Sequence, residues 1–306
     1  MESVKKYILT DETLEFDGHL LHRIQAVANF GKVKEGDLGG WVEKEENLSH
    51  YGECWVYDEA KVYDNACVCC HAKVRDNARV FGHAEVCGVA TVYEDARVFS
   101  DAEVYGNAKV YGHANVCGNA QVYDYASVCG HAWVANACVS NCASVYGDAR
   151  VDGHAKIHGC ACVRDNAVVR GDAQVYGWSE VGGDACILGN AHVYGYAKVR
   201  GNAWIDGDAC VYDKAIISGE ANVGGCTAIC GDAVVEGTED YIVFKNNFSS
   251  GRWFTWTKSN DMWRVGCFYG TGKELIKKAS EDSKEKGEYY KLYVGLVKKI
   301  KKINHG

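Results

Sequence analysis

An aliphatic residue returns every six positions from Val56 to Val235, and an alanine precedes almost every one of them by two positions. Units such as A-K-V-Y-G-N and A-N-V-C-G-N recur, and Ser179 and Thr227 are mild exceptions at the alanine position. Because side chains alternate along a strand, the alanine and the aliphatic residue share one face, and their neighbours face outward. A short repeat of fixed period predicts a solenoid in which each unit is one short strand and one corner.

The positions after each aliphatic residue predict the corners. Gly or Asp follows it by two positions, and Asn, Asp or His follows it by three. These residue types tolerate turns and left-handed backbone conformations. Three units would close a triangular coil, which predicts about ten coils in all. The step from Val134 to Val139 is one residue short, and both a shortened corner and a bend that serves a partner remain open.

The segments that flank the repeat follow other patterns. Before it, Lys6–Thr10 and Leu20–Ile24 resemble strands around a turn at 16–18, so residues 1–50 are interpreted as a β cap over the apolar end of the solenoid. The repeat domain is placed at 51–240. Residues 241–306 are expected to form a small α+β domain, with three aromatic strands and two helices.

The expected C-terminal domain has two distinct patterns. Its strands are placed at Tyr241–Phe244, Arg252–Thr257 and Trp263–Phe268. The second helix has an apolar stripe at helical spacing, predicted to pack on the strands, with oligomerisation as the alternative: Tyr289, Tyr293, Leu296, Ile300 and Ile303.

Composition narrows the class of protein. The chain has 306 residues, no proline and 16 cysteines. No apolar run approaches the roughly 18 residues of a membrane span, and Met1–Lys6 lacks the apolar core of a signal peptide. We therefore expect reduced thiols and a cytoplasmic location in a bacterial host. Net charge is −8, yet Lys and Arg dominate 241–306. An acidic solenoid with a basic tail argues against duplex nucleic acid as the partner.

The repeat resembles that of the left-handed parallel β-helix proteins, the hexapeptide-repeat family, which is rich in acyltransferases. Gly39-Gly40-Trp41-Val42 and Cys54-Trp55-Val56-Tyr57-Asp58 resemble the capped hexapeptide-repeat acetyltransferases of bacteria, and also repeat proteins encoded by phages and prophages. Phe254–Thr257 and Gly266–Gly272 are similar to a C-terminal element of phage proteins. The resemblance implies an all-β, left-handed parallel β-helix with acyltransferase or phage-type binding roles.

Candidate catalytic residues are weak in this chain. Hexapeptide acyltransferases combine a catalytic His with a loop that interrupts the helix, and here no loop is inserted into the repeat. His113 and His131 should stack on one corner, with Asp148 next, where they could shuttle a proton or bind a metal. A corner ladder of Asn, Asp and His explains the same residues. Cys67, Cys69, Cys70 and Cys87 form a possible soft-metal cluster, for which drift of the repeat at outward positions is the alternative.

Two outward stripes are candidate binding surfaces. The first contains Tyr105, Tyr123, Tyr176, Tyr194 and Tyr212. In the second, basic residues flank aromatic ones: Lys61, Tyr63, Arg79, Phe81, Arg97 and Phe99. Stacked aromatic residues also stabilise a sheet, so a purely structural role is the alternative. Aromatic stripes also suit a protein partner, and cations among aromatic rings could hold a phosphate and stack a base.

The leading hypothesis is a non-catalytic, phage-type binding protein. It presents a flat face to a host protein or sequesters a small, nucleotide-like ligand, with antagonism of host defence as the purpose that the phage resemblance implies. The first alternative is an acyltransferase using coenzyme A, with a corner histidine as general base. The second is a structural trimeric rod of a virion. No cofactor other than coenzyme A in the first alternative, no metal and no membrane partner are expected, and a homodimer or homotrimer is left open.

Overall fold

The computed structural model describes residues 5–303, so Met1–Val4 of the N-terminal segment considered above lie outside the described residues. The chain divides into two compact units, unit 1 at Met1–Gly183 and unit 2 at Asp184–Gly306. In both units the repeat folds as a parallel β-solenoid, and it makes about 11 turns in all. No helix within 5–303 has the length and apolarity that crossing a bilayer requires.

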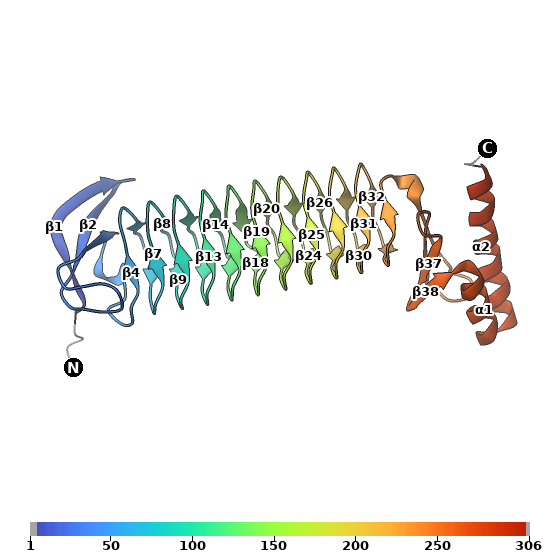
Figure 1. Cartoon of the computed structure of the whole chain (residues 1–306), viewed down its shortest axis with the longest axis horizontal. Coiled ribbons are helices and arrows are strands. Elements are labelled where there is room, and N and C mark those ends of the chain that lie inside the picture. The colour runs from blue at the N-terminus through green and yellow to red at the C-terminus, as the bar shows by residue number, and fades with distance from the viewer. Residues whose placement is uncertain (1–4, 304–306) are drawn as a thin grey trace. The chain divides into compact units, whose positions relative to one another are not determined.

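The solenoid of unit 1 has three faces of parallel strands (Figure 1). The first face contains β3 (Leu38–Val42), β5 (Lys61–Val62), β8 (Arg79–Val80), β11 (Arg97–Val98), β14 (Asn115–Cys117), β17 (Trp133–Ala135), β20 (Arg150–Val151) and β23 (Val168–Val169). The second face contains β4 (Trp55–Val56), β7 (Lys73–Val74), β10 (Thr91–Val92), β13 (Lys109–Val110), β16 (Ser127–Val128), β19 (Ser144–Val145), β22 (Cys162–Val163) and β25 (Glu180–Val181). The third face contains β6 (Cys67–Val68), β9 (Glu85–Val86), β12 (Glu103–Val104), β15 (Gln121–Val122), β18 (Cys138–Val139), β21 (Lys156–Ile157) and β24 (Gln174–Val175).

The interior is the column of alanines and aliphatic residues that the repeat predicts. Ala108, Val110, Ala126 and Val128 have no exposed surface, and the other coils follow the same pattern. Directly paired residues lie one coil apart, as in Val92↔Val110. Each coil thus packs identical side chains above and below, which explains why substitutions of the alanine are rare.

The corners adopt the left-handed backbone conformation that the sequence predicts. Where Asp replaces Gly there, its φ is still positive, 57° at Asp64 and 59° at Asp76. The carboxylate then accepts a hydrogen bond from the backbone N–H of the corner one coil on, at 3.0 Å from Asp64 to Gly82 N and 3.0 Å from Asp76 to Glu94 N. Asp compensates for the backbone cost by satisfying a corner donor.

The short step between Val134 and Val139 is a shortened corner. Val116↔Val134 and Val122↔Val139 remain in register on either side of it. Asn136 takes the left-handed conformation, and its side-chain oxygen accepts from Asn119 N at 3.0 Å. One side chain therefore supplies the corner contact of the missing residue, and the ladders continue.

A hairpin covers the beginning of the repeat in unit 1. β1 (Tyr7–Phe16) and β2 (His19–Ala26) pair antiparallel around a turn at Asp17 and Gly18, and β2 pairs with β3. β3 then pairs parallel with β5. At the end of the short helix η1 (Glu45–Asn47), the buried Asn47 amide donates to Ala66 O at 2.9 Å. This arrangement confirms a β cap ahead of the solenoid.

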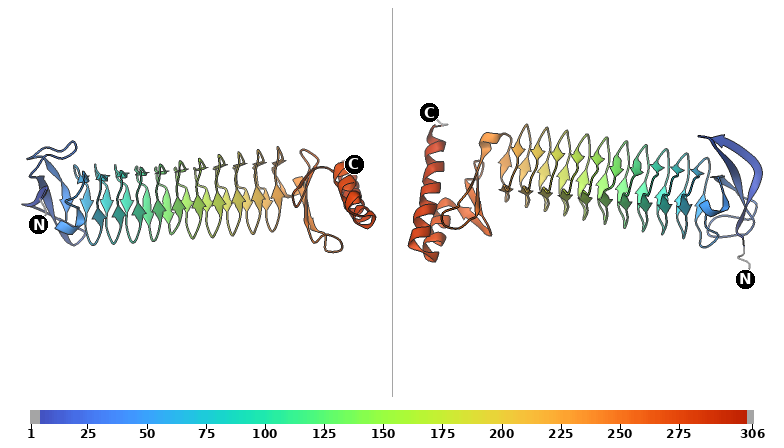
Figure 2. Two further views of the ribbon diagram at one scale, coloured as in Figure 1. Left: turned by 90° about the horizontal axis from the view of Figure 1, so that it is seen from below. Right: turned by 180° about the vertical axis from the view of Figure 1, so that it is seen from behind.

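Unit 2 contains the last coils and the C-terminal domain (Figure 2). Its solenoid strands are β26 (Cys186–Ile187), β29 (Trp204–Ile205) and β32 (Asn222–Val223) on the first face, β28 (Lys198–Val199), β31 (Ile216–Ile217) and β34 (Val234–Val235) on the second, and β27 (His192–Val193), β30 (Cys210–Val211) and β33 (Ala228–Ile229) on the third. Helix η2 (Thr238–Asp240) leads into an antiparallel sheet of β35 (Tyr241–Lys245), β36 (Trp253–Thr257), β37 (Met262–Val265) and β38 (Phe268–Thr271), followed by α1 (Gly272–Asp282) and α2 (Lys284–Ile303).

The C-terminal domain corrects two expectations. The predicted strand at Trp263–Phe268 is two strands, because Gly266 has a φ of 58° and turns the chain between β37 and β38. The face of α2 that packs on the sheet contains the buried residues Tyr290, Val294 and Val297, which the predicted stripe left out. Of the predicted stripe, Tyr293 stacks on Phe244 of β35 at 4.6 Å, whereas Leu296 and Ile303 are exposed.

Candidate functional site

Outward aromatic residues stack in columns on the solenoid faces, one ring per coil. On the third face of unit 1 the ring centroids of Tyr105 and Tyr123 are 4.9 Å apart, and those of His158 and Tyr176 are 4.9 Å apart. Tyr194 and Tyr212 stack at 4.9 Å within unit 2. The second face of unit 1 carries a further pair, Tyr93 and Tyr111 at 4.8 Å, which sequence reasoning missed although its spacing of 18 residues is the same.

The cap covers the first part of the basic and aromatic stripe on the first face. Tyr63, Phe81 and Phe99 stack at 5.1 and 5.0 Å as expected. Tyr63, however, is buried among Leu21, Trp41 and Phe16 of the cap. The ammonium of Lys61 lies over the ring of Phe16 at 5.0 Å. The guanidinium of Arg79 lies over the same ring at 4.6 Å and 3.9 Å from the Asp17 carboxylate. The chain's own hairpin therefore contacts the stripe as far as Arg79, and Arg97 is its first exposed cation.

Next to the hairpin, a polar groove of about 330 Å³ follows the corner between faces in unit 1. Its walls include Arg79, Arg97, His113 and His131, which the sequence had assigned to two separate features. The His113 and His131 rings stack at 4.8 Å. Since the corner column and the first-face column are neighbours in every coil, their side chains meet in this groove.

The carboxylate beside the histidine pair is Asp95. Its Oδ2 lies 3.8 Å from Nδ1 of His113. Asp148, the expected third member, is exposed, and its backbone N–H donates to Asp165 O one coil on. The groove can thus offer a stacked imidazole pair, two guanidinium groups and one carboxylate to a solute.

Two side-chain clusters within 5–303 have the composition of a metal site. One is Cys69, Glu85 and Cys87 on the third face of unit 1. The other is His19, Glu43 and Asp64 beneath the cap, where His19 Nδ1 and Glu43 Oε1 are 3.1 Å apart. Glu43 Oε2 also accepts from Asp64 N, and the hydrogen bond to Glu43 raises the pKa of His19. The second cluster is therefore an internally bonded latch that holds the cap.

A second hollow, of about 350 Å³, lies in unit 2 between the third face and the C-terminal sheet. Tyr194 and Tyr212 form one wall. The other wall consists of Arg252 from the loop before β36, Trp253 from β36 and Arg264 from β37. The guanidinium of Arg264 lies over the Tyr212 ring at 5.5 Å and donates to Cys267 O at 3.2 Å. Sequence reasoning identified the two tyrosines but missed the arginines, because nothing in a strand pattern tells which face of a sheet meets the solenoid.

The sheet is attached to the last coil by hydroxyl groups. Thr255 Oγ1 accepts from Ala228 N at 3.2 Å, and Ser259 Oγ accepts from Val234 N at 2.8 Å. These two donors belong to β33 and β34, which have no further coil to pair with. The C-terminal domain thus satisfies the backbone end of the repeat while it walls the pocket.

The Tyr212 hydroxyl is a distinctive group in this pocket. It is buried and has no hydrogen-bond partner. Burial first, and the neighbouring Cys230 thiol second, raise the pKa of Tyr212 far above its usual value. A buried hydroxyl without a partner costs free energy, about 1–3 kcal/mol for a typical group.

Comparison with known proteins gives a partial resemblance. No protein-family model matches the chain. Over 64 residues it is 38% identical to a protein of Escherichia coli (strain K12) named uncharacterized acetyltransferase YdcK. The match covers 18% of this chain and 20% of the YdcK protein, so only a fifth of that relative's length is spanned. The chain is therefore a repeat β-solenoid protein that resembles bacterial proteins named as acetyltransferases.

Proposed function

We propose that this protein is a non-catalytic binding protein that holds a planar, anionic small molecule of the nucleotide class in the pocket of unit 2. The observation that carries the proposal is the pairing of Arg252 and Arg264 with the aromatic walls Tyr212 and Trp253. Guanidinium groups bind phosphates through paired hydrogen bonds, and aromatic rings stack on bases.

Size and charge support this class of ligand. Small-molecule sites measure roughly 300–1,000 Å³, and the pocket measures about 350 Å³. Among the described residues that line it, two are arginines and none is Asp or Glu. An anion that enters meets no opposing carboxylate on the walls, so the local field favours its binding.

The pocket lacks the groups that chemistry on such a ligand would need. Among the described lining residues there is no His, Lys or carboxylate to move a proton. Its titratable groups other than arginine include Cys210 and Tyr212, and burial is the first cause that raises the pKa of each. A protonated thiol and a protonated phenol are poor nucleophiles, which supports binding without turnover.

Isothermal titration calorimetry with 5′-AMP and ATP tests the proposal, with adenosine and inorganic phosphate as separate component probes. We expect binding of at least one nucleotide, and an affinity loss of about 100-fold in Arg252→Gln/Arg264→Gln, from two charge-assisted contacts. The matched control, Arg79→Gln/Arg97→Gln, removes the same charge from the groove of unit 1 and should bind as the unchanged protein does. Chromatography should recover the nucleotide intact. Equal losses in both variants, or no binding of any probe at millimolar concentration, would refute the proposal.

An acyltransferase that uses acetyl-coenzyme A is the second candidate. The resemblance to the protein named acetyltransferase YdcK favours it, together with the groove of unit 1, where a histidine pair could act as general base and two arginines could bind the phosphates of coenzyme A. In this candidate coenzyme A is the acyl donor, and no metal participates.

Release of coenzyme A from acetyl-coenzyme A, followed by chromatography, tests the second candidate. Chromatography is used because thiol-reactive dyes would also react with the 16 cysteines of the chain. If the candidate is right, His113→Gln/His131→Gln lowers the rate by about 100-fold or more, whereas the exposed pair His71→Gln/His83→Gln leaves it unchanged. Absence of release above the buffer rate would rule the candidate out. Phage origin, a role against host defence, a flat face for a host protein and a virion rod remain predictions from the resemblance and the sequence.

A further inference from the structure

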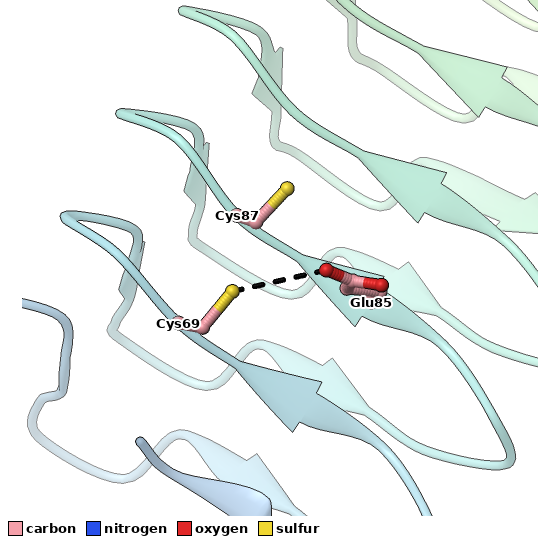
Figure 3. Close-up of side chains that lie close together, drawn as sticks. All are labelled: Cys69, Glu85 and Cys87. Atoms are coloured by element: carbon pink, nitrogen blue, oxygen red, sulfur yellow. Dashed lines mark hydrogen bonds between the residues drawn. The ribbon is translucent and has the colours of Figure 1, made fainter. Parts of the chain in front are cut away.

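The third face of unit 1 gathers four cysteines at its first coils, outside the groove and the pocket described above. Cys67 and Cys69 lie at outward positions of one coil, Cys70 lies at its corner, and Cys87 lies one coil on, in line with Cys69. Glu85 is the direct cross-strand partner of Cys67. Figure 3 shows the thiols of Cys69 and Cys87 pointing the same way, with the Glu85 carboxylate beside them.

The distances fit a small, thiophilic cation. Sγ of Cys69, Sγ of Cys87 and a carboxylate oxygen of Glu85 all lie within 4.8 Å of one another. Cys69 Sγ is 3.8 Å from Glu85 Oε1 and 3.8 Å from Cys70 Sγ. In a tetrahedral zinc site with bonds of about 2.3 Å, two sulfur ligands are roughly 3.8 Å apart, so small side-chain rotations would bring all three groups to bonding distance.

We propose that Cys69, Glu85 and Cys87 bind one zinc-class divalent ion on the outer surface of the solenoid. Binding releases the two thiol protons to solvent while the Glu85 carboxylate coordinates as an anion, so no oxidant or reductant is needed. The two thiolates and the carboxylate clamp two successive coils together. The site is independent of the proposed nucleotide pocket and stands whether or not that pocket binds a ligand.

Cobalt titration of the full chain tests the site. The protein is stripped with EDTA, reduced with a non-chelating phosphine and titrated with Co²⁺, whose thiolate complexes have a charge-transfer band in the near ultraviolet and strong visible bands when tetrahedral. We expect saturation at one equivalent, displacement of Co²⁺ by Zn²⁺, and tighter binding as pH rises. In Cys69→Ser/Cys87→Ser the bands should vanish and Zn²⁺ affinity should fall by about 100-fold or more.

A second cysteine pair provides the matched control. Cys142 and Cys160 are neighbours one coil apart, and each stands at a corner. Cys142→Ser/Cys160→Ser removes as many thiols and should leave the cobalt spectrum intact. Circular dichroism checks that the serine variants are folded. We expect them to fold because Cys69 and Cys87 face outward. Unchanged bands in Cys69→Ser/Cys87→Ser, no bands in the unchanged protein, or a Cys69–Cys87 disulfide in place of metal would each overturn the proposal.

Discussion

The groove of unit 1 and the pocket of unit 2 are similar in size but are built in different ways. Repeat residues alone make the groove, in which Arg79, Arg97 and the histidine pair share the walls with Asp95. In the pocket, repeat tyrosines meet Arg252 and Arg264 from a segment outside the repeat. The repeat pairs Arg79 directly with Arg97 on neighbouring strands, but Asp95 shares the groove with them. Among the described residues that line the pocket, the two arginines have no carboxylate beside them.

The contrast concerns what a solenoid can offer by itself. Stacked corners and stacked rings give a regular surface whose polar groups partly neutralise one another. In the pocket, the C-terminal sheet of unit 2 provides a second structural layer over a tyrosine column. The following predictions test this contrast, from the largest expected effect to the smallest.

The first prediction compares an interior corner with a terminal one. Gly106 and Gly225 have φ values of 68° and 65°, but a Cβ on Gly106 would lie 2.8 Å from Asp124 N, whereas a Cβ on Gly225 would meet nothing within 4 Å. Gly225→Ala should cost only the left-handed strain, about 1 kcal/mol. Gly106→Ala should cost about 3 kcal/mol, because the next coil must move. Urea unfolding measures both, and equal costs would contradict a close-packed interior corner.

The second prediction removes the attachment of the pocket wall. Thr255→Val keeps the shape of the side chain but leaves the N–H of Ala228 without its acceptor. We expect a loss of about 2 kcal/mol in the free energy of unfolding, together with weaker nucleotide binding. Thr91→Val on the second face of unit 1 is the matched control and should change stability by less than about 0.5 kcal/mol. If Thr255→Val leaves the free energy of unfolding unchanged, other contacts hold the sheet to the last coil.

The third prediction concerns the unpartnered hydroxyl of Tyr212. Tyr212→Phe removes a buried group that has no hydrogen bond, so the unliganded protein should keep its stability or gain up to about 1 kcal/mol. Thermal unfolding of both proteins without ligand measures this difference. If Tyr212→Phe is less stable than the unchanged protein without ligand, the hydroxyl has a hydrogen-bond partner and the prediction is wrong.

The fourth prediction uses the latch beneath the cap. The hydrogen bond to Glu43 raises the pKa of His19, so the folded state holds this proton more tightly than the unfolded chain does. The stabilisation from this bound proton is complete below about pH 6.5, and it is lost as pH rises through the pKa of His19 in the folded state. His19→Gln should therefore lower the melting temperature at about pH 5.5 but not at about pH 8.5, by an amount equivalent to less than about 1 kcal/mol. A pH-independent difference would refute the role of the proton.

The repeat regions could be predicted in detail because each position of the repeat has a single structural role. Alanines and valines fill the prism, Gly and Asp make left-handed corners, and even the short step after Val134 is accommodated by Asn136. Outside the repeat the prediction was weaker. The turn at Gly266 splits an expected strand, and the buried contacts of α2 are Tyr290, Val294 and Val297, whereas only part of the predicted stripe packs on the sheet. Both faces of that helix carry apolar residues, so periodicity alone could not choose between them.

The sequence by itself determined the solenoid, the columns of stacked rings and the residues of the histidine pair, because a six-residue period maps each position onto one face and one coil. Tertiary structure decided which of these residues are accessible and which meet. It buries Tyr63 under a hairpin, sets Cys69 and Cys87 beside Glu85, and places Arg264 over Tyr212. The physical reason is that each of these contacts joins a column to another column or to a segment outside the repeat. Such contacts depend on side-chain direction and on docking, which a one-dimensional period does not encode.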